Sequence, residues 1–275
     1  MRLLGPFSDH VVATASGPAP IVRPPGWMML AETRALAELG LVAPALPALA
    51  MAPRGDGHPV LVLPGFLADD RATRILRTCL DRLGHAVYGW EQGRNVGPTA
   101  EALAGMAERL DRLADLHGTP VSLVGWSLGG IFARELARAA PDRVRRVVTL
   151  AAPFRDPRAT NLDPLFRMLE PLHARRLDET TGPALARPLP VPATAVYTRG
   201  DGLVAWASCL EDEGPSPAGA ERENVEVAGS HLGLPHNPAA LLVVADRLAL
   251  APGEWRPYRA RGWNALFFPG RSSAA

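Results

Sequence analysis

Ser127 lies in a pattern that is typical of a serine nucleophile. The sequence Gly125-Trp-Ser127-Leu-Gly129 follows a short apolar run at 120–124, which predicts a strand, and precedes a helical pattern at 131–139. A serine hydroxyl attacks efficiently only when it is exposed beside a base, and a sharp strand-to-helix turn with flanking glycines exposes it. The alternative is a glycine-rich phosphate-binding turn, but this segment does not match the G-x-G-x-x-G pattern of such turns. We therefore predict that Ser127 is a nucleophile.

A serine nucleophile needs a histidine that removes its proton, and His231 has the most suitable position. It follows a predicted strand at 224–227 after a three-residue turn, which places it on a loop at the end of that strand. His236 lies at the start of the closing helix and fits a capping or surface role better. Surface or structural roles are also expected for the other histidines, which are His10, His58, His85, His117 and His173.

Asp201 is the predicted acid that orients this histidine. It directly follows a predicted strand at 193–198 and lies between Ser127 and His231 in the chain, which gives the expected order of serine, acid and histidine. Glycines on both sides allow a tight turn, so an ordinary turn aspartate is the alternative interpretation. The other acidic candidates fit an insertion or a solvated loop better; these are Asp156, Asp163 and 211–213.

Acyl transfer also requires N–H donors that bind the oxyanion formed in the transition state. The backbone N–H of Leu128, the residue after the nucleophile, is expected to be one donor. The loop Pro64-Gly65-Phe66, which follows a predicted strand at 58–63, should supply the other from the N–H of Phe66. We also expect the ring of Phe66 to wall the acyl pocket.

Three further residues are candidates for contact with a substrate. Trp126 lies beside the nucleophile, and Arg94 and Asn95 lie in a loop at 89–95 that follows another predicted strand. Arg94 and Asn95 fit two roles equally well: they bind a polar part of the substrate, or they brace the loop.

Strands and helices alternate along most of the chain. Apolar runs predict strands at 58–63, 86–90, 120–124, 144–150, 193–198 and 224–227, and helical patterns occur at 27–41, 69–83, 99–116, 131–139 and 238–250. Such alternation predicts an α/β fold, a mostly parallel sheet with helices on both faces. The groups that act on a ligand should then lie beyond the carboxyl ends of the strands.

Two segments stand apart from the alternating pattern. Residues 153–192 contain eight prolines and one short helical segment at 165–172, which indicates an insertion over the active edge. Residues 1–57 form an irregular arm and a helix that we expect to pack on the core. The main domain is then predicted at 58–275.

Together, these motifs resemble the α/β-hydrolase superfamily, and within it the lipase and esterase branch. The resemblance covers residues 58–250 and is carried by Pro64-Gly65-Phe66, Gly125-Trp-Ser127-Leu-Gly129-Gly130, Tyr197-Thr-Arg-Gly-Asp201-Gly202 and Gly229-Ser230-His231. The first motif often begins with His-Gly in that family, whereas Pro64 stands there in this chain. The resemblance implies that 153–192 is a cap or lid.

Composition excludes several classes of enzyme. All 29 basic residues of the 275-residue chain are arginine, which excludes a Schiff-base lysine, a pyridoxal-phosphate anchor and the lysine of a P-loop. The net charge of +1 gives no global attraction to nucleic acid. Cys79 and Cys209 show no metal-ligand spacing and fit two free thiols better than one disulfide. We expect neither a cofactor nor a metal ion.

The longest apolar tract, 27–52, is the one segment that raises the question of a membrane. It carries Glu32, Arg34 and Glu38 and is broken by Pro44 and Pro47, so we do not expect it to span a bilayer. It either docks on the domain itself or lies flat on a membrane, and the lack of a Lys/Arg-rich face favours docking. The first ten residues lack an apolar stretch and cleavage site typical of export, so a cytoplasmic location is expected.

The sequence thus predicts a serine hydrolase that cleaves a small or lipid-like carboxylic ester through an acyl-enzyme intermediate. Three alternatives keep the fold: an acyltransferase with the same triad, a hydrolase acting on thioesters, amides or polyesters, and a binding protein without catalysis.

Overall fold

One parallel sheet forms the centre of the structure, a computed structural model that describes residues 20–174, 182–212, 220–260 and 268. Its strands pair in the order β2-β1-β3-β4-β5-β6, and each of these pairings is parallel. The strands are β1 (Pro59–Leu63), β2 (Ala86–Gly89), β3 (Val121–Trp126), β4 (Val144–Leu150), β5 (Ala193–Tyr197) and β6 (Arg222–Glu226). The predicted α/β fold is confirmed, and each predicted strand has a counterpart in the sheet.

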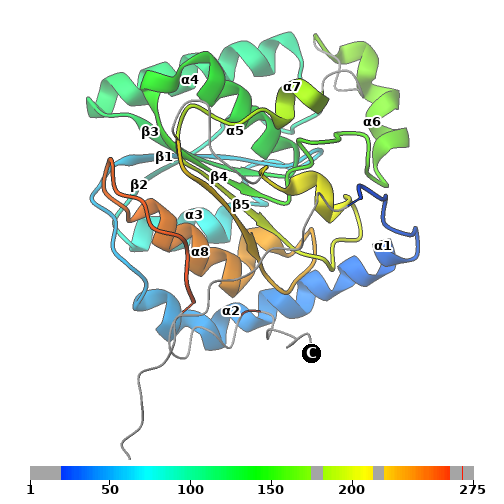
Figure 1. Cartoon of the computed structure of the whole chain (residues 1–275), viewed down its shortest axis with the longest axis horizontal. Coiled ribbons are helices and arrows are strands. Elements are labelled where there is room, and N and C mark those ends of the chain that lie inside the picture. Colours follow the sequence, from blue (N-terminus) through cyan, green and yellow to red (C-terminus); the bar gives the residue numbers. More distant parts are fainter. Residues whose placement is uncertain (1–19, 175–181, 213–219, 261–267, 269–275) are drawn as a thin grey trace, which may run out of the picture.

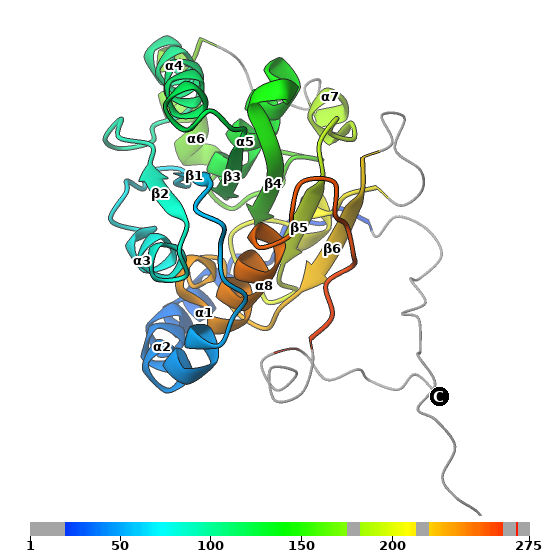
Figure 2. The same ribbon diagram turned by 90° about the vertical axis from the view of Figure 1, so that its left-hand side faces the viewer.

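Helices cover both faces of the sheet (Figures 1 and 2). One face carries α4 (Ala100–His117), α5 (Leu128–Ala139) and α7 (Gly182–Ala186), and the other carries α2 (Ala35–Ala50), α3 (Arg74–Arg82) and α8 (Pro238–Leu248). The short α1 (Met28–Ala31) leads into α2, and α6 (Asp163–Leu169) lies in the connection between β4 and β5.

The core is divided by the sheet into two apolar layers because side chains of a strand point alternately to its two faces. In β1, Val60 and Val62 pack in the layer under α2, α3 and α8, whereas Leu61 and Leu63 pack in the layer under α4 and α5. All four side chains are fully buried. An apolar residue is therefore needed at every position of this strand, which is why it appears in the sequence as a continuous apolar run.

The strand order fixes the place where a ligand is expected. From β1 the chain passes outward to β2 and then returns to β3 on the other side of β1. This reversal forms a switch point, where open parallel sheets bind ligands beyond the carboxyl ends of their strands. The loop after β1 begins at Pro64 and the turn after β3 contains Ser127, so both lie at this point.

The helix predicted at 27–41 is longer in the structure, and this prediction is corrected. α2 continues to Ala50 through Pro44 and Pro47, although a proline inside a helix costs about 3 kcal/mol because it removes a donor and crowds the preceding turn. Both prolines are exposed, and the same turns bury Ala45, Ala48 and Leu49 against the core. Tertiary packing therefore outweighs the local preference.

The helix predicted at 69–83 begins later, at Arg74, and Asp70 before it binds the loop that follows β2 instead. The carboxylate of Asp70 accepts hydrogen bonds from the backbone N–H groups of Trp90 and Glu91, each 3.0 Å long. These bonds hold the chain at the carboxyl end of β2. Cys79 of α3 and Cys209 are both free thiols, as the sequence favours.

Candidate functional site

Ser127 occupies the turn between β3 and α5 in a backbone conformation that few residues adopt. Its φ is 54° and its ψ is −123°, a region that costs a residue with a side chain about 1–3 kcal/mol. The turn is sharp because two glycines permit it: a Cβ on Gly125 would lie 2.3 Å from the carbonyl oxygen of Gly129, and a Cβ on Gly129 would lie 2.3 Å from that of Leu63. This is the geometry of a nucleophile elbow.

His231 and Asp201 form a buried hydrogen-bonded pair at the same edge of the sheet. The distance from His231 Nδ1 to Asp201 Oδ2 is 2.7 Å, and both residues are at most 3% exposed. The other carboxylate oxygen, Oδ1, accepts the backbone N–H groups of Leu203 and Val204 at 2.8 and 2.7 Å. Asp201 is thus fixed by its own turn, and its bond to Nδ1–H leaves Nε2 of His231 as the proton acceptor.

The protonation of His231 is set by opposing effects. Burial by itself lowers the pKa of an imidazole, because it disfavours the cation. The charge of Asp201, its hydrogen bond to the ring and the charge of Glu32 act in the other direction and together raise the pKa of His231 above 6.5. The pair therefore favours the imidazolium that forms when a histidine takes a proton from a nucleophile.

Trp126 connects the serine turn to the histidine loop. Its indole Nε1–H donates to the carbonyl oxygen of His231 at 3.0 Å, and the two rings lie 5.8 Å apart between centroids. Within the described part of the chain, no hydrogen bond joins Ser127 Oγ to the imidazole. The three predicted residues thus converge at one edge, with the acid and the base in contact. Hydrogen bonds of a nucleophile often shorten only when substrate is bound.

The predicted oxyanion donors lie on the two loops that meet at the switch point. A Cβ on Gly65 would lie 3.1 Å from Cβ of Ser127, so the loop after β1 passes directly against the nucleophile. Neither the N–H of Phe66 nor that of Leu128 donates to an acceptor within the described residues. Two N–H groups beside the serine therefore have no other partner in that part of the chain.

Asn95 is fully buried and makes its hydrogen bonds within this loop region. Its side-chain Nδ2 donates to the carbonyl oxygen of Pro64 at 2.8 Å, and its Oδ1 accepts the N–H of Gly97 at 3.1 Å. Its backbone carbonyl also accepts the N–H of Leu67, which has a φ of 60°. These bonds fit the bracing alternative for Asn95, whereas Arg94 is exposed.

The connection between β4 and β5 contacts two loops of the candidate site. The ring of Phe66 packs against Phe166 of α6 with 5.2 Å between centroids, and Phe166 in turn contacts His173. Thr160 pairs with Val204 beside the Asp201 turn through an isolated antiparallel bridge. The segment predicted as a cap, 153–192, is therefore attached both to the loop after β1 and to the loop of Asp201, with 175–181 lying outside the described residues.

Glu32 is a residue of the site that the sequence did not identify. It is only 3% exposed, and its carboxylate accepts the backbone N–H groups of Gly202, His231 and Leu232 at 2.8, 3.1 and 2.8 Å. One carboxylate thus joins the acid loop to the base loop from the 3₁₀ turn between α1 and α2. A charge inside an otherwise apolar helix was the signal for it, since such a charge needs a buried partner.

Glu38 and Arg34 extend this attachment. Glu38 accepts the N–H of Ser230 at 2.8 Å and the side-chain amide of Asn237 at 2.9 Å, and Arg34 donates to the carbonyl oxygens of Gly200 and Gly229. The N-terminal helix is therefore docked on the domain at the loops that carry Asp201 and His231.

One group of potential metal ligands lies away from the site. Asp56, His58 and His85 each offer a ligand atom, and these atoms lie within 4.8 Å of one another near the amino ends of β1 and β2. Arg145 donates to Asp56 at 2.8 Å, and the positive charges of Arg145 and Arg146 both lower the pKa of His58, which burial lowers most. The same two charges oppose a divalent cation, so we assign no metal to this group.

Comparisons with known proteins agree with the geometry. A family model described as the alpha/beta hydrolase fold matches residues 58–189. No curated protein matches the sequence. Among solved structures, Aspergillus fumigatus lipase B is similar with a TM-score of 0.56 and 18% identity, over 72% of this chain and 54% of that one. The chain thus spans about half the length of that lipase.

A second lipase, BlEst2 of Bacillus licheniformis in its mature form, is similar with a TM-score of 0.53 and 14% identity, over 73% of this chain and 95% of that one. At such identities the similarity concerns the fold. The matched segment 58–189 contains the loop after β1 and the Ser127 turn, whereas the motifs around Asp201 and His231 lie outside it. The chain therefore has the α/β-hydrolase fold.

Proposed function

We propose that the protein is a serine hydrolase that cleaves carboxylic esters through a triad of Ser127, His231 and Asp201. The observation that carries the proposal is the buried 2.7 Å bond between His231 Nδ1 and Asp201 Oδ2 at the same sheet edge as a serine in the elbow conformation. A histidine oriented in this way has its second nitrogen free to accept a proton from a nucleophile.

The reaction follows from these positions. Ser127 Oγ attacks the ester carbonyl while Nε2 of His231 takes its proton, and Asp201 stabilises the imidazolium. The N–H groups of Phe66 and Leu128 bind the oxyanion of the tetrahedral intermediate. His231 then returns the proton to the leaving alcohol as the C–O bond breaks, and water, activated by the same nitrogen, hydrolyses the acyl-enzyme and restores the serine.

Two aromatic rings at the loop after β1 support an apolar acyl group as the part of the ester that is transferred to Ser127. Phe66 belongs to the loop after β1, and its ring lies tilted against that of Phe166 with 5.2 Å between centroids. Burying an apolar acyl chain against two aromatic rings is favourable because it removes apolar surface from water.

The test is a series of p-nitrophenyl esters of increasing acyl length, measured with the wild type and with Ser127→Ala. We expect the wild type to hydrolyse at least one ester and the variant to lose about 10⁴-fold or more of that rate. A fluorophosphonate probe should label the wild type at Ser127, and the labelled residue is identified by mass spectrometry. An added alcohol acceptor separates hydrolysis from acyl transfer by the product that forms.

Equal slow hydrolysis by the wild type and by a folded Ser127→Ala protein contradicts the proposal. Circular dichroism and a thermal melt of the variant show that it is folded, so loss of rate is then due to loss of the hydroxyl.

A further inference from the structure

The outer face of α2 is apolar along its whole length. Leu36, Leu39, Ala43, Leu46 and Ala50 follow one another at intervals of three and four residues, which places them on one side of the helix, and all five are exposed. Residues 35–53 contain a single charged side chain, Glu38, and that side chain is buried. This face therefore presents no charge to solvent, although it borders the loops of the candidate site.

The apolar face continues at the N-terminal end of the helix. Trp27 is 68% exposed and Leu30 is 77% exposed, both at the end that lies beside the Asp201 turn. Scattered exposed apolar residues are normal on a protein, but a contiguous stripe of this length marks an interaction surface.

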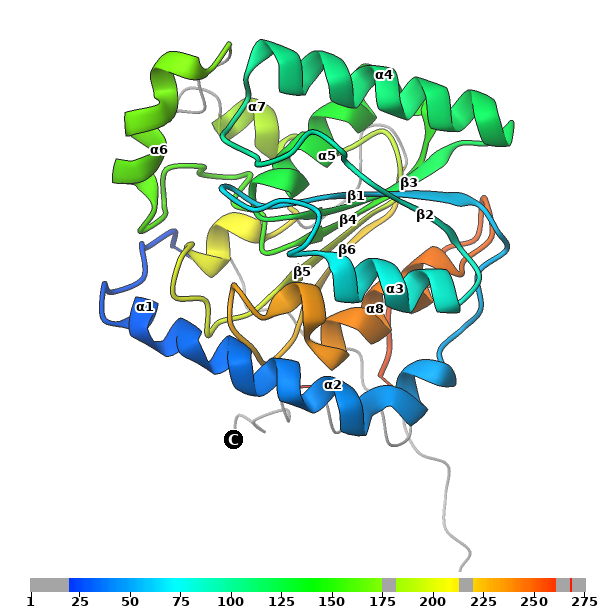
Figure 3. The same ribbon diagram turned by 180° about the vertical axis from the view of Figure 1, so that it is seen from behind.

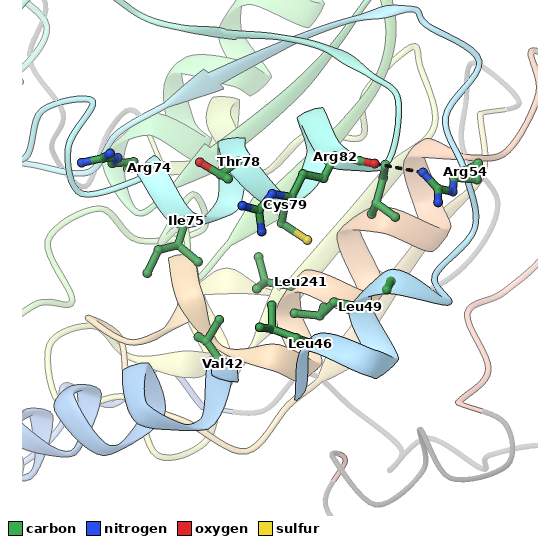
Figure 4. Close-up of a pocket in the computed structure, with 12 residues that line it drawn as sticks. Val42, Leu46, Leu49, Arg54, Arg74, Ile75, Thr78, Cys79, Arg82 and Leu241 are labelled. Carbon is green, nitrogen blue, oxygen red and sulfur yellow. Dashed lines mark hydrogen bonds between the residues drawn. The ribbon is translucent and has the colours of Figure 1, made fainter. Parts of the chain in front are cut away.

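A groove of about 640 Å³ adjoins this face between α2, α3 and α8 (Figure 4). Its floor is apolar and includes Val42, Leu46, Leu49, Ile75 and Leu241. Burial raises the pKa of the Cys79 thiol, which also lines the groove, to about 11, so that this side chain stays neutral. The groove can therefore accept a hydrocarbon chain.

Three arginines, Arg54, Arg74 and Arg82, lie at the groove, and the described residues that line it include no carboxylate. All three are exposed, and none of them forms an ion pair with another described residue. The side chain of Arg54 contacts the backbone of Arg82: its Nη1 donates to the carbonyl oxygen of Arg82 at 3.0 Å (Figure 4). Unpaired guanidinium groups beside an apolar floor are complementary to an amphiphile with an anionic head.

We propose that the outer face of α2 and the adjoining groove form a docking surface for an anionic lipid bilayer. The apolar stripe enters the interface between headgroups and acyl chains, and Arg54, Arg74 and Arg82 bind lipid phosphates beside it. The surface is distinct from the candidate catalytic residues, none of which lines the groove.

Charge distinguishes a bilayer from a second copy of the chain. Closed dimers usually place the same patch of both copies together, and here that would bring three arginines against three arginines with no carboxylate in the groove to offset them. The length of the stripe distinguishes a bilayer from one bound fatty acid, because Trp27, Leu30 and Leu36 lie beyond the lining of the groove.

The helix lies along the surface of the domain and is not free to cross a membrane as it stands. Met28–Ala50 has the length and hydropathy of a membrane span, with 22% of the tested stretch buried. However, Glu32 and Glu38 on its inner face are hydrogen-bonded to the loops at Gly202 and Ser230, and α2 runs beneath α3 and α8 (Figure 3). One docked face and one apolar face are the arrangement of a helix that lies in an interface.

The test is co-sedimentation of the full chain with phosphatidylcholine vesicles and with vesicles of phosphatidylcholine and phosphatidylglycerol in equal parts. We expect binding to the anionic vesicles to be at least about tenfold stronger and to weaken at high salt. Leu36→Glu with Leu39→Glu should abolish it. The matched control is Leu116→Glu, since Leu116 is 70% exposed but lies on α4, across the sheet from α2 (Figure 1).

The arginines are tested in the same way. Arg74→Gln with Arg82→Gln should weaken binding to anionic vesicles by about fivefold for each arginine and leave binding to neutral vesicles unchanged. Arg112→Gln with Arg143→Gln removes two charges from the α4 side and should have no effect.

Three outcomes overturn the proposal. One is no binding to either vesicle; another is binding that the α2 and α3 substitutions leave unchanged. The third is a dimer, seen by sedimentation at the same protein concentration, that forms through α2 in place of vesicle binding. None of these substitutions changes a residue of the candidate triad, so hydrolysis of a soluble p-nitrophenyl ester is a separate readout of the catalytic proposal.

Discussion

The carboxylate of Glu32 accepts a 3.1 Å hydrogen bond from the backbone N–H of His231, across 199 residues of sequence. The same oxygen also accepts the N–H of Gly202, next to Asp201, so a single atom spans the loops of the acid and the base. Rigid loops matter here because misplacement of a catalytic group by about 1 Å can cost 10²-fold in rate. Glu32 is therefore a positioning residue for the proposed triad.

Replacing Glu32 with Gln tests this role. The substitution keeps the shape but exchanges one acceptor oxygen for an NH₂ group, which faces the N–H of Gly202, His231 or Leu232 without a bond. It also removes a charge that raises the pKa of His231. We expect kcat for ester hydrolysis to fall roughly 10–100-fold with little change in KM, and the acid limb of the rate profile to move to lower pH.

Glu38→Gln is the matched control for this substitution. Glu38 is also buried, on the following helix α2, and bonds to Ser230, but its charge is not among those that raise the pKa of His231. We expect it to lower the melting temperature and to leave the acid limb in place. If the two variants have the same pH profile, Glu32 has only a structural role.

The pH dependence of the wild type follows from the direction of the His231 shift. The proposed mechanism requires neutral His231, so kcat/KM should rise with pH through a pKa above 6.5. Burial opposes this shift, while Asp201 and Glu32 produce it. In Asp201→Asn the acid limb should move below that of the wild type, and kcat should fall by roughly 10⁴-fold. A wild-type limb below 6.5 contradicts the electrostatic account.

The stability of the fold should change with pH in the opposite sense. Because the folded pKa of His231 exceeds its unfolded value, its contribution is present below about 6.5 and is lost as pH rises through the folded pKa. Thermal melts of the wild type and of Asp201→Asn across this window measure the loss, which should be smaller in the variant.

The sheet and the Ser127 turn could be predicted from the sequence because their signals are local. The apolar run of β1 and the Gly-x-Ser-x-Gly spacing around Ser127 can each be recognised within a few consecutive residues, although the contact of Gly129 with Leu63 is not local. The end of α2 could not be predicted, because it depends on Ala48 and Leu49 packing against a distant core. Propensity alone places the end of that helix before Pro44.

The role of Glu32 could not be predicted either, because it also depends on residues that are distant in the sequence. Its partners are backbone N–H groups, which any residue except proline would supply at those positions. The sequence therefore shows only an acidic residue in an apolar helix, with no complementary side chain to identify where it binds. The loops that meet it exist only once the sheet has brought their strands together.

Asn95 and Arg94 fit two roles equally in the sequence, and substitution separates them. Asn95→Ala leaves the buried carbonyl of Pro64 and the N–H of Gly97 without their partners, which should cost roughly 1–3 kcal/mol in the free energy of unfolding. Because Pro64 begins the oxyanion loop, kcat should fall as well. Arg94→Ala should change neither by a measurable amount. Urea unfolding and ester kinetics on both variants provide the check. An Asn95→Ala protein with the same free energy of unfolding as the wild type contradicts the bracing role.

The nucleophile turn should not tolerate a side chain at Gly129. The Cβ of Gly129→Ala would lie 2.3 Å from the carbonyl oxygen of Leu63, which belongs to β1, a strand paired on both sides, and cannot move freely. We expect loss of several degrees in melting temperature and of nearly all hydrolysis. Gly40→Ala is the matched control: a Cβ there meets nothing within 4 Å, and alanine in a helix should stabilise by about 0.5–1 kcal/mol. Equal stability of the two variants would contradict the packing argument.

His85 should control the stability of the fold in mild acid. Its two ring nitrogens are buried without a partner among the described residues, and the ring lies edge-on to His58 at 4.9 Å between centroids. Burial, aided by the charge of His58, lowers the pKa of His85 to about 4. Since the unfolded chain takes up a proton near 6.5, its contribution to stability is present above that pH and is lost as pH falls toward 4.

The difference of about 2.5 pKa units corresponds to a loss of up to about 3 kcal/mol in the free energy of unfolding across that window. His85→Phe keeps an aromatic ring against Gly55 and removes the titrating group. We expect urea unfolding of the wild type to weaken between pH 7.5 and 4.5 by clearly more than that of the variant. The substitution removes only His85 and leaves the other buried histidines in place. If the free energy of unfolding falls equally in both proteins over this pH range, His85 is not the cause of the acid sensitivity.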